Sequence, residues 1–143
     1  MKTRFQFIEN SNSLGEVSYV PYLPFSLSFR DHVISASGLL DTGSSVNVLP
    51  YEIGLQLGLN WDDYNTSVIL AGNLAKFPAK GVILSMAVDG FTPVTLVFAW
   101  TQAQDIPLIL GRVNFFREFD VCFYGSQLFF EVSPKSSGDR SFE

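Results

Sequence analysis

The stretch "GLLDTGSSVNVLP", residues 38–50, runs from two leucines straight into an aspartate, continues through Thr-Gly-Ser-Ser, and then returns to apolar residues. Apolar runs of this kind are typical of buried strands. Asp41 therefore stands at the end of such a strand, where a carboxylate is costly unless it is bonded or serves chemistry. One interpretation is an ordinary turn, because Asp caps turns and Gly43 accepts a positive φ. The other is a catalytic carboxylate.

Length and composition limit the possible functions. The chain has 143 residues, which is enough for one compact domain with its own core. Apolar residues make up 47% and charged residues 16%, as in a folded protein. The net charge is −5 and the basic residues are scattered, so nucleic acid and anionic membrane surfaces are poor candidate partners.

Targeting signals and cysteine usage bear on the compartment. The N-terminus lacks an apolar stretch of signal-peptide length, and no apolar run approaches the roughly 18 residues of a membrane span. The single cysteine, Cys122, lies in an apolar segment, where we expect a buried thiol. Because one cysteine cannot form an internal disulfide, it suits a reducing compartment. We therefore expect a cytoplasmic protein.

Alternating apolar and polar residues predict strands joined by tight turns. Residues 24–30 and 32–40 predict one hairpin. Residues 82–88 and 91–100 predict a second one around Asp89-Gly90, with a type I′ turn. Residues 121–124 and 127–132 predict a third one around Gly125-Ser126, with a type II′ turn.

Helices have little room in this sequence. Two short ones are predicted, over residues 50–59 with Pro50 in the first turn and over residues 112–119 after Gly111. The sequence therefore predicts an all-β fold, a small closed or nearly closed barrel with one or two short helices.

A second element follows the first motif at a distance. In "PLILGRVNFF", residues 107–116, an apolar strand ends in Gly111 and passes into a short predicted helix. The two elements, in this order, resemble those of the aspartic peptidases. At this chain length they resemble the single-domain retroviral-type branch, the retropepsins and their bacterial relatives.

The resemblance covers residues 24–132, nearly all of the predicted fold. It implies that Asp41 is the catalytic acid, that Thr42 and Gly43 complete its loop, and that a supporting element is formed by Ile109, Leu110 and Gly111. It implies neither a cofactor nor a metal. Residues 1–23 remain as an N-terminal segment, a candidate for the dimer interface, and the polar residues 133–143 are expected to form a disordered tail.

Peptide hydrolysis of this type needs two carboxylates that share one proton, because two like charges a few Å apart cannot both ionise. The ionised one takes a proton from a water, and the protonated one donates to the scissile carbonyl. The chain contains one Asp-Thr-Gly, and its other aspartates occupy turn or polar contexts. The second carboxylate is therefore expected from Asp41 of another copy, in a homodimer.

The neighbours of Asp41 have expected roles. The resemblance implies that the Thr42 hydroxyl bonds to the partner's backbone. Ser44 is expected to hydrogen-bond the outer oxygen of Asp41, which would favour an acidic working pH. In retroviral enzymes the arginine at the place of Arg112 pairs with an aspartate, but this chain has Ser45 there. Either Arg112 has another acidic partner or that part of the interface is built differently.

A flap over the substrate is expected between the two motifs. "SVILAGNLAKFPAKG", residues 67–81, predicts a hairpin with a flexible tip at Ala71, Gly72 and Asn73; the alternative is an ordinary surface hairpin. An extended peptide substrate would lie beneath it. We expect Ser45 and Ile109 to contact the substrate as well, although Ile109 could equally belong to the core.

The expected function is that of an aspartic endopeptidase acting on peptides or proteins. A competing hypothesis is a non-catalytic retropepsin-like dimer that binds peptides or mediates assembly. The intact Asp-Thr-Gly argues against it, because a binding module needs no buried aspartate. A third hypothesis is a small-ligand barrel, for which the pair of motifs would be a coincidence.

Overall fold

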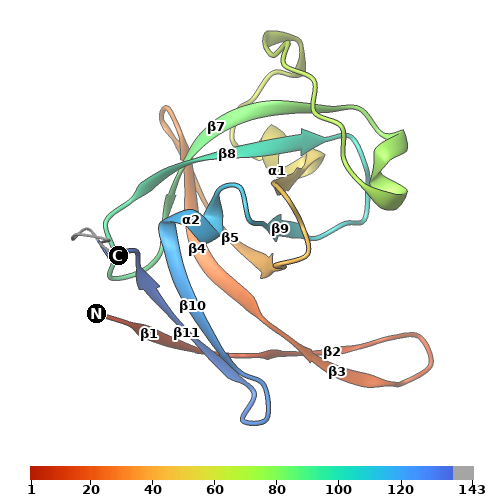
Figure 1. Cartoon of the computed structure of the whole chain (residues 1–143). Helices are drawn as coiled ribbons and strands as arrows, with labels where there is room; N and C mark the ends of the chain where they lie inside the picture. Colours follow the sequence, from red (N-terminus) through yellow and green to blue (C-terminus); the bar gives the residue numbers. More distant parts are fainter. Residues whose placement is uncertain (137–143) are drawn as a thin grey trace, which may run out of the picture.

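A computed structural model describes residues 1–136 (Figure 1). Apart from short helical segments, the described chain consists of strands and their connections. The strands are β1 (Thr3–Gln6), β2 (Ile8–Ser11), β3 (Val17–Val20), β4 (Tyr22–Phe29), β5 (His32–Leu40), β6 (Asn47–Pro50), β7 (Ala79–Ala87), β8 (Val94–Thr101), β9 (Leu108–Leu110), β10 (Phe119–Tyr124) and β11 (Phe129–Pro134).

Six strands form a closed barrel in the order β4-β5-β9-β6-β8-β7. The β5–β9 and β6–β8 pairs are parallel, and the other pairs are antiparallel. The prediction of a small all-β barrel is confirmed. Buried leucines and aromatic residues fill its interior, among them Leu23, Leu84 and Phe98, so this barrel is a packed core.

The three predicted hairpins form, but two of their turns differ from the prediction. β4 and β5 are joined tightly, with Phe29 opposite His32. The β7–β8 connection spans residues 88–93, because Val88 and Phe91 turn into the core and lengthen the loop. Phe91 N donates to Val88 O at 2.9 Å and closes a turn around Asp89-Gly90, but of these two residues only Gly90 has a positive φ, 87°, so the predicted type I′ is wrong.

The connection between β10 and β11 is likewise longer than predicted, with four residues, 125–128, in place of a two-residue turn. Gln127 N donates to Tyr124 O at 3.0 Å, which closes a turn inside the loop. The positive φ falls at Leu128, with φ = 62°, and not at Gly125. The type II′ prediction is therefore wrong, because the register pairs Tyr124 with Phe129, whose rings stack 4.6 Å apart.

Both predicted helices are present and short. α1 (Tyr51–Gln56) starts directly after Pro50, and α2 (Phe115–Glu118) precedes β10. α1 packs closely on the barrel, since a β-carbon at Gly54 would collide with the indole of Trp100. Two 3₁₀ turns, η1 (Trp61–Asp63) and η2 (Gly72–Lys76), complete the described helical segments. None of the helices in residues 1–136 is long and apolar enough to cross a membrane.

A separate sheet, β1-β11-β10, brings the two ends of the described chain together. Phe5 and Phe130 stack on one face with their ring centroids 5.4 Å apart. β11 extends through Pro134, and Lys135 bonds to Glu118, so the described chain is ordered beyond the boundary expected at residue 132. Of the expected tail, residues 137–143 lie outside the described part. Cys122 is exposed on β10, which corrects the expectation of a buried thiol.

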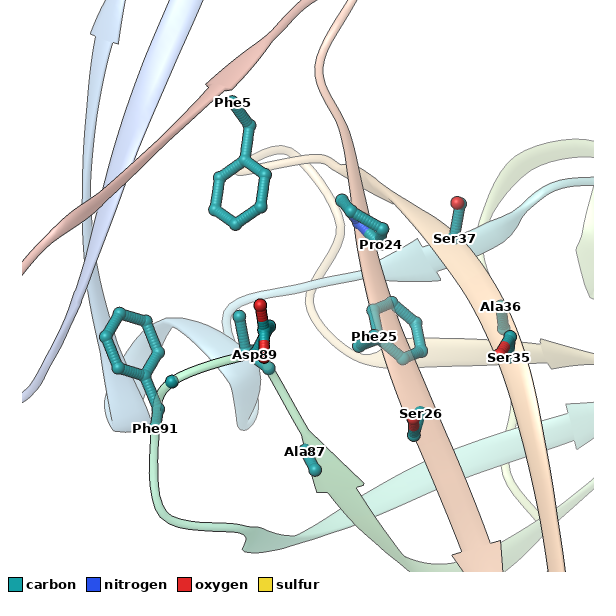
Figure 2. Close-up of a pocket in the computed structure, with 12 residues that line it drawn as sticks. Phe5, Pro24, Phe25, Ser26, Ser35, Ala36, Ser37, Ala87, Asp89 and Phe91 are labelled. Atoms are coloured by element: carbon teal, nitrogen blue, oxygen red, sulfur yellow. The ribbon is translucent and has the colours of Figure 1, made fainter.

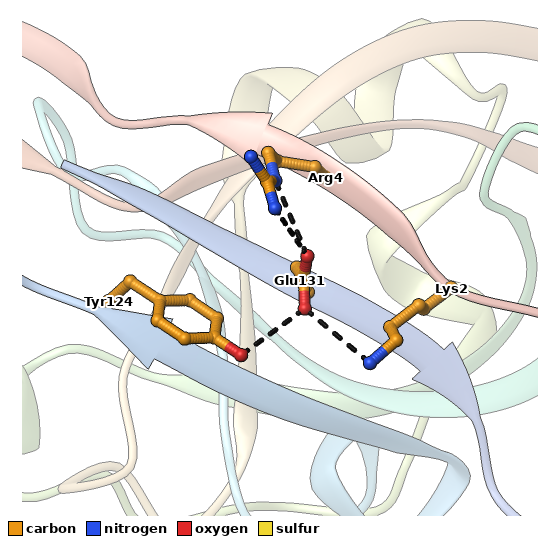
Figure 3. Close-up of polar contacts among 4 residues, drawn as sticks. All are labelled: Lys2, Arg4, Tyr124 and Glu131. Atoms are coloured by element: carbon orange, nitrogen blue, oxygen red, sulfur yellow. Dashed lines mark hydrogen bonds and ion pairs between the residues drawn. The ribbon is translucent and has the colours of Figure 1, made fainter. Parts of the chain in front are cut away.

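Glu131 holds the other face of this sheet together (Figure 3). Its carboxylate accepts a hydrogen bond from Arg4 at 3.0 Å and lies 3.7 Å from Lys2 Nζ. The bond from Arg4 lowers the pKa of Glu131, and Lys2 adds to this effect. Tyr124 also donates to Glu131 at 3.4 Å. The hydrogen bond and the charge interaction between Tyr124 and Cys122 raise the pKa of Tyr124 to about 12, and the charge of Glu131 contributes less to this increase.

The lowered pKa predicts how stability depends on pH. The ionised Glu131 stabilises the fold at a pH above its unfolded pKa, about 4.3, and this contribution is lost as the pH falls through the lower folded pKa. We expect wild type to be more stable than Glu131→Gln near neutral pH, with a difference that shrinks below about pH 4. Urea unfolding across this range measures it, with Glu9→Gln as the control for a lost charge. A difference that does not change with pH would contradict the prediction.

Candidate active site

The backbone around Asp41 holds its carboxylate at the end of β5. Asp41 N donates to Leu110 O at 3.0 Å, which continues the parallel pairing of β5 with β9. Gly43 N donates to Asp41 Oδ1 at 2.9 Å. Ser44 N then donates to Asp41 O at 3.1 Å and closes the turn. The carboxylate is thus oriented by a turn of its own chain, and Asp41 stays partly accessible.

Gly111 allows the second element to cross this loop in direct contact. Arg112 N donates to Ser44 O at 2.9 Å and Val113 N to Ser45 O at 2.8 Å. A β-carbon at Gly111 would collide with the carbonyl of Val46 and would lie 2.8 Å from Ser44 O. Such an approach of two backbones requires glycine. The supporting role expected for Gly111 therefore has a steric basis.

Asn47 fixes the same crossing from inside the barrel. Its side chain is fully buried, Oδ1 accepts from Gly111 N at 2.8 Å, and Nδ2 donates to Val97 O at 3.0 Å. Sequence reasoning missed this residue. The sequence does contain an indication of its role, because Asn47 is the one amide in the apolar run "VNVLP" and a buried polar side chain needs hydrogen-bond partners.

Arg112 and Ser44 have partners other than those expected. Arg112 Nη1 donates to Thr42 O at 2.7 Å, and the described residues offer it no carboxylate. Within residues 1–136 it holds the Asp41 loop through the carbonyl of Thr42. The Ser44 hydroxyl donates to Val46 O at 2.7 Å. The expected bond from Ser44 to Asp41 is therefore wrong, because the loop folds this side chain back onto its own strand.

The Asp41 loop borders a groove of about 380 Å³, a volume in the usual range for ligand sites. One wall is the segment around Ala71, and the floor is apolar. The structure gathers seven of the predicted site residues here, namely Asp41, Gly43, Ser44, Ser45, Ala71, Ile109 and Arg112. Sequence reasoning missed Val46, Val48, Leu70 and Leu74, of which the first two follow the period of two along a strand.

Five predicted residues lie beside this groove without lining it, namely Thr42, Gly72, Asn73, Leu110 and Gly111. Thr42 is exposed on the loop, and Leu110 is buried in the core. Gly72 opens η2 with φ = 63°.

The predicted flap is paired only at its base. Ser67 bridges Lys80, and Val68 N donates to Ala79 O at 2.9 Å. Between them the chain forms η2 in place of the predicted strands and β-turn. The reason is that Leu70 and Leu74 turn inward against the groove floor, which bends the segment away from an extended hairpin.

A larger groove of about 880 Å³ lies between β1 and the β4–β5 hairpin (Figure 2). Phe5, Phe25 and Phe91 contribute aromatic rings to its wall, and Asp89 lines it as well. None of the predicted site residues lines it. The larger of these two grooves is therefore separate from Asp41.

Comparison with solved structures supports the fold. A retropepsin-like aspartic protease from Rickettsia conorii superimposes with a TM-score of 0.54 and 15% sequence identity, over 92% of each chain. No protein-family model matches the sequence, and no curated protein matches it either. At this identity the likeness shows a shared fold, and the chain has the barrel of a retropepsin-like protease.

We expect Asn47→Ala to destabilise the protein by roughly 2 kcal/mol or more, because it leaves the buried Gly111 N–H without its partner and opens a cavity. Asn65→Ala changes an exposed asparagine and should stay within about 0.5 kcal/mol of wild type. Chemical denaturation at a fixed protein concentration measures both. Equal stability of the two variants would mean that Asn47 does not hold the crossing.

Proposed function

We propose that this protein is a retropepsin-like aspartic endopeptidase of the bacterial branch, active as a homodimer. The observation that carries the proposal is the position of Asp41. Its carboxylate is oriented by Gly43, its loop is supported by Gly111, and it borders a groove with an apolar floor. Among the described residues this carboxylate forms no ion pair, and such a carboxylate is suited to proton transfer.

The proposed chemistry needs a second carboxylate. Asp41 is the only acidic residue among the described residues that line the groove. A second copy would supply its own Asp41 across a two-fold axis. One carboxylate then takes a proton from a bound water, which attacks the scissile carbonyl, while the other donates its proton to the carbonyl oxygen.

The groove favours an extended peptide with apolar side chains. Its floor is formed by Val46, Val48 and Ile109, and Leu70 and Leu74 face them from the other wall. A peptide laid between these walls would alternate its side chains between pockets. A reducing compartment such as the cytoplasm is part of the proposal, since the exposed thiol of Cys122 has no internal partner.

Asp41→Asn tests the assigned acid. The amide keeps an oxygen for the bond from Gly43 N, so we expect normal folding and assembly with loss of all detectable peptidase activity. Cleavage of a peptide library between about pH 3 and 7 measures it. Asp62→Asn, the same change at an exposed site in η1, should cleave like wild type. A library that binds wild type but is never cut would favour the non-catalytic hypothesis.

Mixing wild type with Asp41→Asn tests the shared site. When equal amounts are mixed, random pairing leaves about a quarter of the dimers fully wild type. A mixed dimer keeps only one functional carboxylate, so activity per wild-type chain should fall to about half. A mass-tagged copy must first show that subunits exchange. With exchange complete, activity that simply follows the amount of wild-type chain would mean that one chain suffices.

A further inference from the structure

The β2–β3 hairpin, residues 8–20, extends away from the barrel and is here called the arm (Figure 1). Within residues 1–136 its two strands pair only with each other. Large apolar side chains stand in the open along it: Leu14 is 82% exposed, Val17 54% and Tyr19 45%. Apolar residues gathered on one exposed element of this kind mark an interaction site.

The arm is an ordered structure and not a loose loop. The Asn12 side chain accepts from Leu14 N at 2.9 Å and from Glu16 N at 3.0 Å, and it donates to the Glu16 carboxylate at 2.7 Å. Gly15 supplies the positive φ of the turn. A two-stranded hairpin in water is marginally stable by itself. A tip so fully bonded, on strands that nothing in the described chain covers, indicates that another molecule completes the packing.

The base of the arm lies beside the Asp41 loop. β3 continues through Pro21 into β4, and Leu40 N donates to Pro21 O at 3.0 Å. Tyr22 is opposite Leu39 in the β4–β5 pair. Asp41 follows Leu40 directly in the sequence, so the arm leaves the barrel at the place where the proposed function requires the second copy.

Charge on the arm narrows the choice of partner. Residues 8–20 contain Glu9 and Glu16 and no lysine or arginine. An anionic membrane surface would repel such a segment, since surface-binding hairpins and helices depend on basic residues. A protein surface with apolar patches is the better match.

We propose that the arm clasps a second copy of this chain, with Leu14, Val17 and Tyr19 against the partner's barrel beside the partner's own catalytic loop. Val17 and Tyr19 face the same way, because they are two residues apart on one strand. The inference rests on the proposed function, which places the two Asp41 loops side by side. By two-fold symmetry each copy would give one arm and receive one.

A pair of matched substitutions tests the arm. Val17→Lys puts a charge on the arm, and Val33→Lys makes the same change on a barrel strand, at a valine that is 66% exposed near the end of β5 remote from Asp41. Both residues are exposed in the single chain, so both variants should fold. Because a symmetric interface contains the substitution twice, we expect Val17→Lys to raise the dimer Kd at least about tenfold and Val33→Lys to leave it unchanged.

A shortened arm provides a second variant. Replacing residues 9–19 by Asn-Gly keeps the Ile8 and Val20 pair and closes it with a two-residue turn. We expect this chain to be folded by circular dichroism and monomeric by sedimentation, at concentrations where wild type is a dimer. In wild type the amides of residues 8–20 should exchange more slowly as the protein concentration rises.

Each outcome decides the inference independently of catalysis. Equal dimer affinity for Val17→Lys, Val33→Lys and wild type would overturn the clasp, as would a wild type that stays monomeric at every concentration tested. A dimer that depends on the arm but cleaves no peptide would support the clasp and contradict the proposed peptidase. A dimer that cleaves peptides, and whose affinity does not change when the arm is altered, would support the proposed peptidase and contradict the clasp.

Discussion

The direct contact between Gly111 and the backbone of residues 44–46 is the constraint on which the Asp41 side of the barrel depends. Two chain segments meet there without side chains between them, and backbone bonds from Arg112 and Val113 join them. Asn47 satisfies the buried N–H of Gly111 from within. Because the N–H groups of Gly111, Arg112 and Val113 all have partners at the crossing, the loop that carries Asp41 can be held rigidly at the edge of an apolar core.

That rigidity has a chemical use in the proposed mechanism. A carboxylate that must share a proton with a second one has to be placed accurately, since small displacements change the interaction strongly at short range. Here the backbone performs the placement: Gly43 orients the carboxylate and the Arg112 guanidinium bonds to the Thr42 carbonyl. Side chains such as Val46, Val48 and Ile109 are then free to form an apolar floor beside the polar Asp41 loop.

The barrel and the arm differ in how much apolar surface they bury. The interior of the barrel is filled by apolar side chains that are fully buried, as Leu23, Leu49 and Phe98 show. The arm buries almost none, although its strands and turn are regular. Leu14 and Val17 are exposed on an ordered hairpin. The arm therefore has regular local structure but lacks the packing that normally stabilises a two-stranded hairpin. The proposed clasp supplies that packing at the place where the proposed active site needs its second half.

The sequence alone determined the three hairpins of residues 24–132, the barrel class, both short helices and the position of Asp41 at the end of a strand, because these depend on local periodicity and on motifs of adjacent residues. It left the strands β1, β2 and β3 unassigned. The turn types could not be predicted from the sequence. Val88 and Phe91 pack into the core and lengthen one loop, and this packing depends on residues that are distant in the sequence. The partners of Ser44 and Arg112, the role of Asn47 and the 3₁₀ form of residues 72–76 were likewise decided by tertiary structure. Each depends on contacts between segments far apart in the chain, whose distances become defined only when the barrel closes.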